Sequence, residues 1–299
     1  MSKLIQTAVA AVFLSAAAEA ETFKEAFPTQ IIDDRTARMQ LLHGTVALAG
    51  ADAQVVVPDG YYLLGPADAR HVLETVWANP PQPGTLGLMF PDTMTPFGLS
   101  DWAVTFEFDP MGYVSDADAE SYDYVDLLRQ MQADTLAENP ARTKAGFPEV
   151  TLLGWAEPPR YDKEDRKLIW AKRLSFDHSP TETLNYNIRA LGRKGVLVVN
   201  FIATSDQLAE IKAAAPAVSQ AVSFTSGNTY ADFLPDVDTV AAVGIGGLIA
   251  GKVLSSTGIL ALGLLFVKKA GIFVVIGLAW LFRLVKKSMG DKTGGAGSA

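Results

Sequence analysis

Residues 183–203, TLNYNIRALGRKGVLVVNFIA, decide the fold that the sequence predicts. In the first half, apolar and polar side chains alternate with the two-residue period of a strand that buries one face. The apolar set is Leu184, Tyr186 and Ile188, and the polar set is Asn185, Asn187 and Arg189. GRKG (192–195) is typical of a tight turn, and VLVVNFIA (196–203) continues as a strand that is apolar on both faces. The stretch therefore predicts an antiparallel hairpin.

Strands of the same kind are predicted on the N-terminal side of this hairpin. DWAVTFEFD (101–109) alternates with one apolar face, and its other face carries Glu107 and Asp109. Polar loops separate two further pairs of apolar runs, which predict hairpins within 149–176 and 53–64.

Three stretches have the apolar spacing, capping residues or acidic first turn of helices: 66–78, 121–139 and 205–224. A proline at position 216 predicts that the third helix is kinked or broken. Sequential hairpins with helices between them predict an α+β fold, in which helices pack on an antiparallel sheet. A hairpin followed by a helix and a short apolar strand resembles PsbP-like and Mog1-like domains at the level of the fold.

The N-terminus has the three parts of a secretory signal peptide. Lys3 precedes a short apolar run, and AEA at 18–20 has the A-x-A form of a cleavage site. The run is too short for an ordinary membrane span. We therefore expect residues 1–20 to be removed and residues 21–236 to form an extracytoplasmic domain, with an uncleaved anchor as the alternative.

The charge is divided unevenly along the chain. Residues 21–238 carry 31 acidic and 17 basic side chains, whereas residues 239–299 carry 1 acidic and 7 basic ones. The acidic body disfavours nucleic acid as a partner, because phosphate binding needs a basic patch. The absence of cysteine excludes disulfides and thiolate-ligated metals.

An apolar region precedes the basic end of the chain and predicts a membrane-anchoring transmembrane region over 237–287. Residues 240–267 contain one charge, and a second apolar run covers 270–282. The first run is long enough to cross the hydrocarbon, so one span, a two-span hairpin and a single helix over about 259–282 all compete. The positive-inside rule favours an odd number of crossings, because most of the basic residues follow the last run. Residues 288–299 are small and polar and are expected to be disordered.

The same region contains G-x-x-x-x-G-K, the beginning of a phosphate-binding loop, at 246–252. Such a loop follows a buried strand and ends in Ser or Thr, whose hydroxyl ligates Mg²⁺. Val253 occupies that position and no strand is predicted before the motif, so we expect no nucleotide here. Gly247 and Gly251 have instead the G-x-x-x-G spacing that lets two membrane helices pack closely.

Side chains suited to catalysis or metal binding are sparse. His43, His71 and His178 are too scattered for metal-ligand spacing. The acidic run at 116–127 lacks the glycine and the final Glu of a calcium loop. We therefore predict no metal, no cofactor and no catalytic residue. The candidate ligand-binding residues are those on the polar faces of the two clearest strands: Glu107, Asp109, Asn185, Asn187 and Arg189.

Four stretches carry a family resemblance: GWAEPPRYD (154–162), LIWAKRLSF (168–176), LNYNIRALGRKGVLVVNFIA (184–203) and YADFLPDVDTVAAVG (230–244). In these stretches the chain resembles a bacterial family of uncharacterised membrane-anchored proteins, the domain of unknown function 2167. The resemblance covers most of the body and extends into the anchor. It implies a secreted domain tied to the envelope membrane, and it brings no known activity and no catalytic residue.

These observations predict an envelope protein of the bacterial inner membrane with its main domain on the periplasmic side. Its expected partners are the lipid bilayer and either an envelope protein or a second copy of the chain, with neither nucleic acid nor nucleotide. We favour a non-enzymatic binding or interaction module. The alternative is a hydrolase-like enzyme that uses carboxylates on the sheet face. A concave pocket holding Glu107 or Asp109 beside Arg189 would favour that enzyme.

Overall fold

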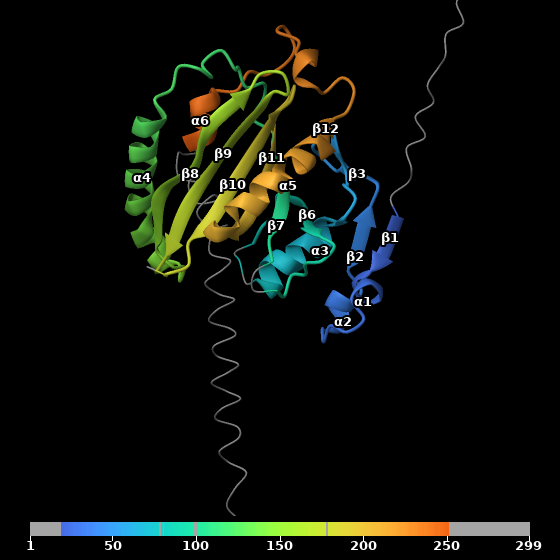
Figure 1. Ribbon diagram of the computed structural model, residues 1–299. Helices are drawn as coiled ribbons and strands as arrows, with labels where there is room; N and C mark the ends of the chain where they lie inside the picture. The colour runs from blue at the N-terminus through green and yellow to red at the C-terminus, as the bar shows by residue number, and fades with distance from the viewer. Residues whose placement is uncertain (1–18, 78, 80, 99–100, 178, 251–299) are drawn as a thin grey trace, which may run out of the picture.

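The computed structural model describes residues 19–250 apart from positions 78, 80, 99–100 and 178. Its centre is a nine-stranded sheet in the order β1-β2-β5-β6-β7-β11-β10-β9-β8, and all of its neighbouring strands run antiparallel (Figure 1). These strands are β1 (Glu19–Thr22), β2 (Gln40–His43), β5 (Tyr61–Leu64), β6 (Thr85–Pro91), β7 (Ala103–Asp109), β8 (Val150–Asp162), β9 (Lys167–Phe176), β10 (Thr183–Leu191) and β11 (Val196–Thr204). A smaller sheet in the order β12-β4-β3 consists of β3 (Thr45–Leu48), β4 (Ala53–Val56) and β12 (Val222–Phe224).

Helices connect and cover these strands. They are α1 (Phe23–Ala26), α2 (Asp34–Ala37), α3 (Pro66–Arg70), α4 (Tyr124–Lys144), α5 (Leu208–Ala221) and α6 (Ile245–Ala250). A π-helix (His71–Val76) continues α3, and single 3₁₀ turns cover Ser205–Gln207 and Tyr230–Asp232. The predicted α+β class, with helices packed on an antiparallel sheet, is confirmed. The hairpin predicted within 53–64 is wrong, because β4 and β5 belong to different sheets and do not pair.

The hairpin predicted over 183–203 lies near the middle of the large sheet. β10 and β11 pair in unbroken register from Thr183 opposite Thr204 to Leu191 opposite Val196. Successive side chains of β10 and β11 point to opposite sides of the sheet, so the sheet has two faces. We call the face that α5 covers the α5 face, and the other the far face.

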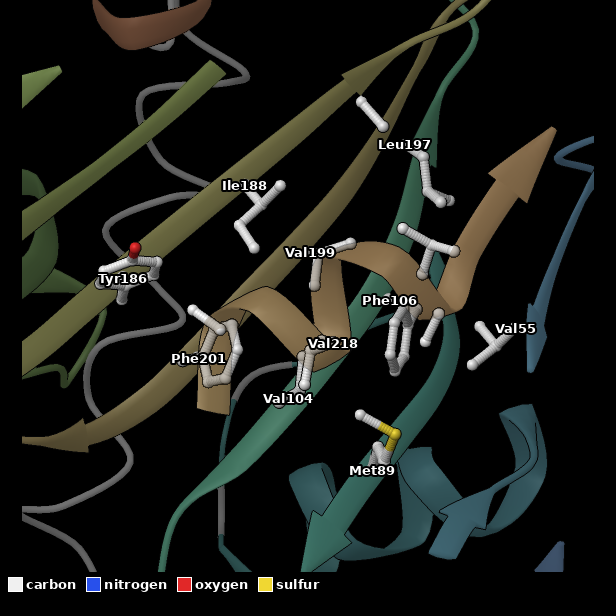
Figure 2. Packing of buried hydrophobic residues seen from close by; sticks show 14 of the residues in the cluster. Val55, Met89, Val104, Phe106, Tyr186, Ile188, Leu197, Val199, Phe201 and Val218 are labelled. Atoms are coloured by element: carbon white, nitrogen blue, oxygen red, sulfur yellow. The ribbon is translucent and has the colours of Figure 1, made fainter. Parts of the chain in front are cut away.

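The α5 face holds the largest apolar cluster. Figure 2 shows Phe106, Val199 and Phe201 from β7 and β11 beside Val218 of α5, and all four side chains are buried. Each buried apolar side chain of this size stabilises the fold by about 1.5–3 kcal/mol relative to an exposed one. The far face carries two separate apolar clusters, one under α4 and α6 and one beside α1 to α3.

Two helices differ from the sequence prediction at a proline. Of the kink or break expected at Pro216, the break does not occur: α5 is continuous from Leu208 to Ala221. α4 likewise runs through Pro140 to Lys144. A proline in a helix removes one backbone hydrogen bond, to the carbonyl four residues earlier. In α5 that carbonyl belongs to Lys212, and packing of the buried side of the helix compensates for its loss.

After β12 the chain returns to the far face through residues 228–244, which we call the connector. Tyr113 stacks on Tyr230 and on Phe233 with ring centroids 4.5 and 3.9 Å apart. The backbone of Tyr113 donates to the carbonyl of Thr239 and accepts from the N–H of Ala241, both at 2.8 Å. The connector is therefore packed against the body.

Residues 1–18 and 251–299 lie outside the described residues. The second range includes most of the predicted anchor at 237–287, with Gly251, and the tail at 288–299. In the described part of the chain, no helix combines the length and the apolar character needed to cross a membrane. Gly247, the other candidate for helix packing, lies in α6.

Candidate functional site

The candidate residues of β10 lie on the far face and are buried. Asn187 donates through Nδ2 to Oδ1 of Asn185 at 2.8 Å, and Asn185 donates in the same way to Oδ1 of Asn200 on β11 at 2.8 Å. The guanidinium carbon of Arg189 lies 5.0 Å from the centre of the ring of Trp170 on β9. The polar stripe that the sequence predicts therefore forms an internal network of amides beside a cation–π contact.

Two buried cations, Arg189 and Lys172, lie beside this network of amides. Burial lowers the pKa of Arg189 to about 10, against the raising influence of Asp109 and Glu107. Burial lowers the pKa of Lys172 on β9 to about 8, and the neighbouring Arg189 adds to this effect. Glu107 and Asp109 are half-buried on β7, one strand away from β10, because Val198 of β11 pairs with both Glu107 and Arg189. The five candidates thus share one face of the sheet.

A pocket of about 210 Å³ lies on the opposite side, between α5 and the strands β8, β9 and β10. Tyr186 and Ile188 of β10, visible beside α5 in Figure 2, belong to its lining. The charged side chains of the lining are Glu157, Arg160, Asp162, Asp165, Lys167 and Lys212. We call this cavity the α5 pocket. None of the five sequence candidates lines it, and Tyr186 and Ile188 alternate with them along β10.

A β-bulge brings Glu157 and Arg160 to the same side. Glu157 pairs with Ala171 and Arg160 with Ile169, so β8 advances three residues while β9 advances two. Residues two apart on a regular strand share a face, whereas residues three apart do not. The extra residue in the stretch Pro158–Pro159 therefore turns both charged side chains toward α5, as bulges beside binding sites often do.

Glu157 joins two cations from different elements. Its Oε1 lies 3.4 Å from Nε of Arg160 on the same strand, and its Oε2 lies 3.3 Å from Nζ of Lys212 on α5. The Glu157 side chain is 15 % exposed, while those of Arg160 and Lys212 are each 54 % exposed. Burial and the charge of Glu157 raise the pKa of Tyr186, against the lowering influence of Arg160. The Glu157 carboxylate is thus largely buried in the pocket, and the half-exposed side chains of Arg160 and Lys212 contact it from the solvent side.

Lys167 closes the other end of the pocket. Its Nζ donates to the carbonyl of Ser219 on α5 at 2.7 Å and lies 3.9 Å from Asp165. Burial lowers the pKa of Lys167, against the raising influence of Asp165 and Asp162. The hydrogen bond ties the start of β9 to the last turn of α5, so the two walls of the pocket are held together.

Sequence reasoning missed this site because its residues come from a loop-like stretch and from a helix. The sequence predicts a polar loop over residues 158–166, PPRYDKEDR, yet the strand pairing continues through Asp162. Two consecutive prolines followed by alternating charges in an edge strand were the available signal, since prolines and bulges are typical of edge strands.

The remaining motifs have structural partners. His43 Nδ1 lies 3.1 Å from the carbonyl of Tyr61, and His71 Nε2 lies 3.2 Å from the hydroxyl of Thr36, whereas His178 is outside the described residues. In the acidic run, Asp118 accepts from the Tyr122 hydroxyl at 2.6 Å. No group of three histidine or acidic side chains in the described part of the chain is arranged to hold a metal ion.

Comparison with known proteins places the chain in a family. A family model described as a protein of unknown function, DUF2167, matches residues 40–279. This protein therefore belongs to the DUF2167 family, as the resemblance in the sequence implied. No curated protein matches the chain.

Among solved structures, the solution structure of cyanobacterial PsbP (CyanoP) from Synechocystis sp. PCC 6803 is similar, with 10% sequence identity and a TM-score of 0.36. The match covers 66% of this chain and 99% of that one. The superposition is too loose to carry a functional argument.

Proposed function

We propose that this protein is an extracytoplasmic binding module, held at the bacterial inner membrane by residues 237–287, that takes a small polar ligand in the α5 pocket. The location is supported by the signal-peptide pattern of residues 1–20 and by the apolar, lysine-flanked C-terminal sequence. The binding role is supported by the geometry of the pocket.

The observation that carries the proposal is the convergence of charged groups from β8, β9 and α5 on one cavity of about 210 Å³. Ligand sites are concave and combine an apolar lining with a few converging polar groups. The α5 pocket has both, because Ile169, Ile188 and Ala215 line it together with its charged side chains. Its volume lies below the roughly 300–1,000 Å³ of drug-sized sites, which indicates a small ligand.

The hydrolase alternative receives less support. It requires a pocket that holds Glu107 or Asp109 beside Arg189, and the α5 pocket lies on the opposite face of the sheet from these three residues. We therefore favour binding over catalysis.

A screen with a blocking variant tests the binding role. The full-length protein in detergent is heated with a library of small polar compounds, and we expect some of them to raise its melting temperature. Gln220→Trp places a large ring at the pocket, because Gln220 is an exposed residue of its lining. Ala217→Trp is the matched control, since Ala217 is exposed on the same helix and does not line the pocket. Stabilisation that survives Gln220→Trp would contradict the proposal.

Reporter fusions test the location. A reporter active only outside the cytoplasm should be active when fused within the connector and inactive when fused after Lys287, because the basic end favours the cytoplasm. Activity after Lys287 would establish a two-span hairpin, with Lys268 and Lys269 in its turn. Inactivity at the connector would remove the extracytoplasmic placement altogether.

A further inference from the structure

We propose that the ligand of the α5 pocket is a small zwitterion with an aliphatic side group, of the amino-acid or short-peptide class. The inference rests on the proposed binding function and specifies its ligand. It is based on three features of the lining: the balance of its charges, their separation into two ends, and the apolar surface between them.

The charges of the lining are balanced. It contains the carboxylates of Glu157, Asp162 and Asp165, and the cations of Arg160, Lys167 and Lys212. Complementary charge gives a site its specificity, and an unmatched charge taken out of water is costly. A simple anion would face the three carboxylates, and a simple cation would face the three basic groups. A ligand with one charge of each sign can satisfy both sets.

One end of the pocket is suited to a carboxylate. Arg160 and Lys212 come from β8 and α5 and already converge on one carboxylate, that of Glu157, at 3.4 and 3.3 Å. A guanidinium has five N–H donors, of which Nε of Arg160 contacts Glu157 and another donor bonds to the side chain of Tyr186. The remaining N–H groups are available to a second carboxylate. The side chains of Arg160 and Lys212 are half-exposed and can therefore turn toward a bound carboxylate.

The other end is suited to an ammonium group. Asp162 and Asp165 lie at the tip of the β8–β9 hairpin, where Oδ1 of Asp162 accepts the backbone N–H groups of Glu164 and Asp165 at 3.1 Å each. These bonds fix the turn and hold the carboxylate of Asp162 in place. The cation of the lining that pairs with Asp165 is Lys167, which makes its closer contact with the carbonyl of Ser219 and lies 3.9 Å from Asp165. An ammonium ion therefore has carboxylates to bind at this end.

The surface between the two ends is apolar. Ile169 and Ile188 are neighbours across β9 and β10, and both line the pocket together with Ala215 of α5. An aliphatic group held here gains about 25 cal/mol for each Å² of apolar surface removed from water. The pocket volume of about 210 Å³ restricts that group to a short aliphatic chain.

Calorimetry with three probes of nearly one shape tests the inference. L-valine carries both charges, L-valinamide lacks the carboxylate, and 3-methylbutanoate lacks the ammonium. We expect the full-length protein in detergent to bind L-valine about tenfold more tightly than either analogue, because each lost ion pair removes a charge-assisted hydrogen bond. An analogue that binds as tightly as L-valine would overturn the zwitterion.

Variants assign the two ends. Arg160→Gln should reduce the preference for L-valine over L-valinamide, because only Lys212 is then left at the carboxylate end. Asp165→Asn should reduce the preference for L-valine over 3-methylbutanoate, because only Asp162 is then left at the ammonium end. Lys163→Gln and Glu164→Gln are charge-matched controls on the exposed tip of the same hairpin, outside the lining, and should leave the ratios unchanged. An unchanged preference in both pocket variants would contradict the assignment.

The two proposals fail differently. If library compounds bind and Gln220→Trp abolishes their binding, but L-valine does not exceed its analogues or does not bind, the pocket stands and the zwitterion is wrong. If neither the library nor L-valine gives binding that is sensitive to Gln220→Trp, the binding function itself is wrong.

Discussion

The guanidinium carbon of Arg166 lies 4.9 Å from the centre of the Tyr230 ring, and the same guanidinium pairs with the carboxylate of Asp116. Arg166 follows Asp165 directly, so of two adjacent residues at one hairpin tip, Asp165 lines the α5 pocket and Arg166 contacts the connector. The hydroxyls of Tyr161 and Tyr230 also bind Asp116, at 2.8 and 3.1 Å. The pocket and the segment that leads to the predicted anchor are therefore joined through a few side chains.

Replacing Arg166 should loosen the connector. Arg166→Gln removes the ion pair and the cation–π contact, which together contribute about 1 kcal/mol for a partly exposed side chain. We expect faster hydrogen exchange at backbone amides of residues 230–241, measured by mass spectrometry. Lys163→Gln on the same hairpin is the control. Unchanged exchange in Arg166→Gln would show that the connector is held by its other contacts, the aromatic stack and backbone hydrogen bonds of Tyr113 and the ion pair of Arg193 with Asp238.

Acid should weaken the ion pair between Arg166 and Asp116. Burial raises the pKa of Asp116, but the hydrogen bonds from Tyr161 and Tyr230 and the charge of Arg166 outweigh it, so the net pKa is lowered. A carboxyl with a lowered pKa stabilises the folded state above its unfolded pKa of about 3.9, and this stability is lost as the pH falls through the folded value. Asp116→Asn should therefore flatten the decline of unfolding free energy below about pH 4. A slope identical to that of the wild type would refute this.

Lys172 should destabilise the protein at neutral pH. Its pKa of about 8 in the folded state lies below the unfolded value of about 10.4, so the folded state binds fewer protons between these values and stability rises with pH there. Lys172→Met should raise the unfolding free energy by about 1–3 kcal/mol at pH 7, a gain that shrinks toward pH 10. Urea denaturation at both pH values measures it, with Lys163→Met as the exposed control. A loss of stability at pH 7 would mean that contacts of the ammonium outweigh its burial.

Asn139 should be needed to close the edge of the sheet. From α4 it donates through Nδ2 to the carbonyl of Val150 at 3.0 Å and accepts the N–H of the same residue at 2.9 Å, as a neighbouring strand would. Asn139→Ala should cost about 2–3 kcal/mol of unfolding free energy, because two buried backbone groups lose their partners. Chemical denaturation measures the loss, and at a pH low enough to protonate it Asn139→Asp, whose carboxyl can then both donate and accept, should cost less. Equal losses in the two variants would indicate that packing matters more than these bonds.

The mature chain should begin at Glu21. Cleavage after Ala20 removes the pairs that Glu19 and Ala20 make with β2, and leaves Thr22 opposite Gln40 at the end of the sheet. The side chain of Thr22 still caps α1, since it accepts from the N–H of Glu25 at 3.3 Å. N-terminal sequencing of protein from the membrane fraction measures the start, and an intact Met1 in most molecules would contradict it.

The sequence by itself determined the class of fold. The alternation over 183–203 predicted β10 and β11 to within one residue of their ends. It could do so because the two-residue period of a strand and the chemistry of a tight turn are local properties of the chain. The alternation also placed Tyr186 and Asn187 on opposite faces of the sheet, as the structure has them.

Only the tertiary structure decided which of those faces carries a pocket. The stripe of Asn185 and Asn187 was polar in pattern, and its burial depends on cross-strand partners such as Asn200 rather than on the strand itself. The α5 pocket needs a bulge between Glu157 and Arg160, which is defined by pairing with β9, and a lysine on α5 about fifty residues away along the chain. Register and the approach of distant elements arise from packing of the whole domain, and local periodicity does not encode them.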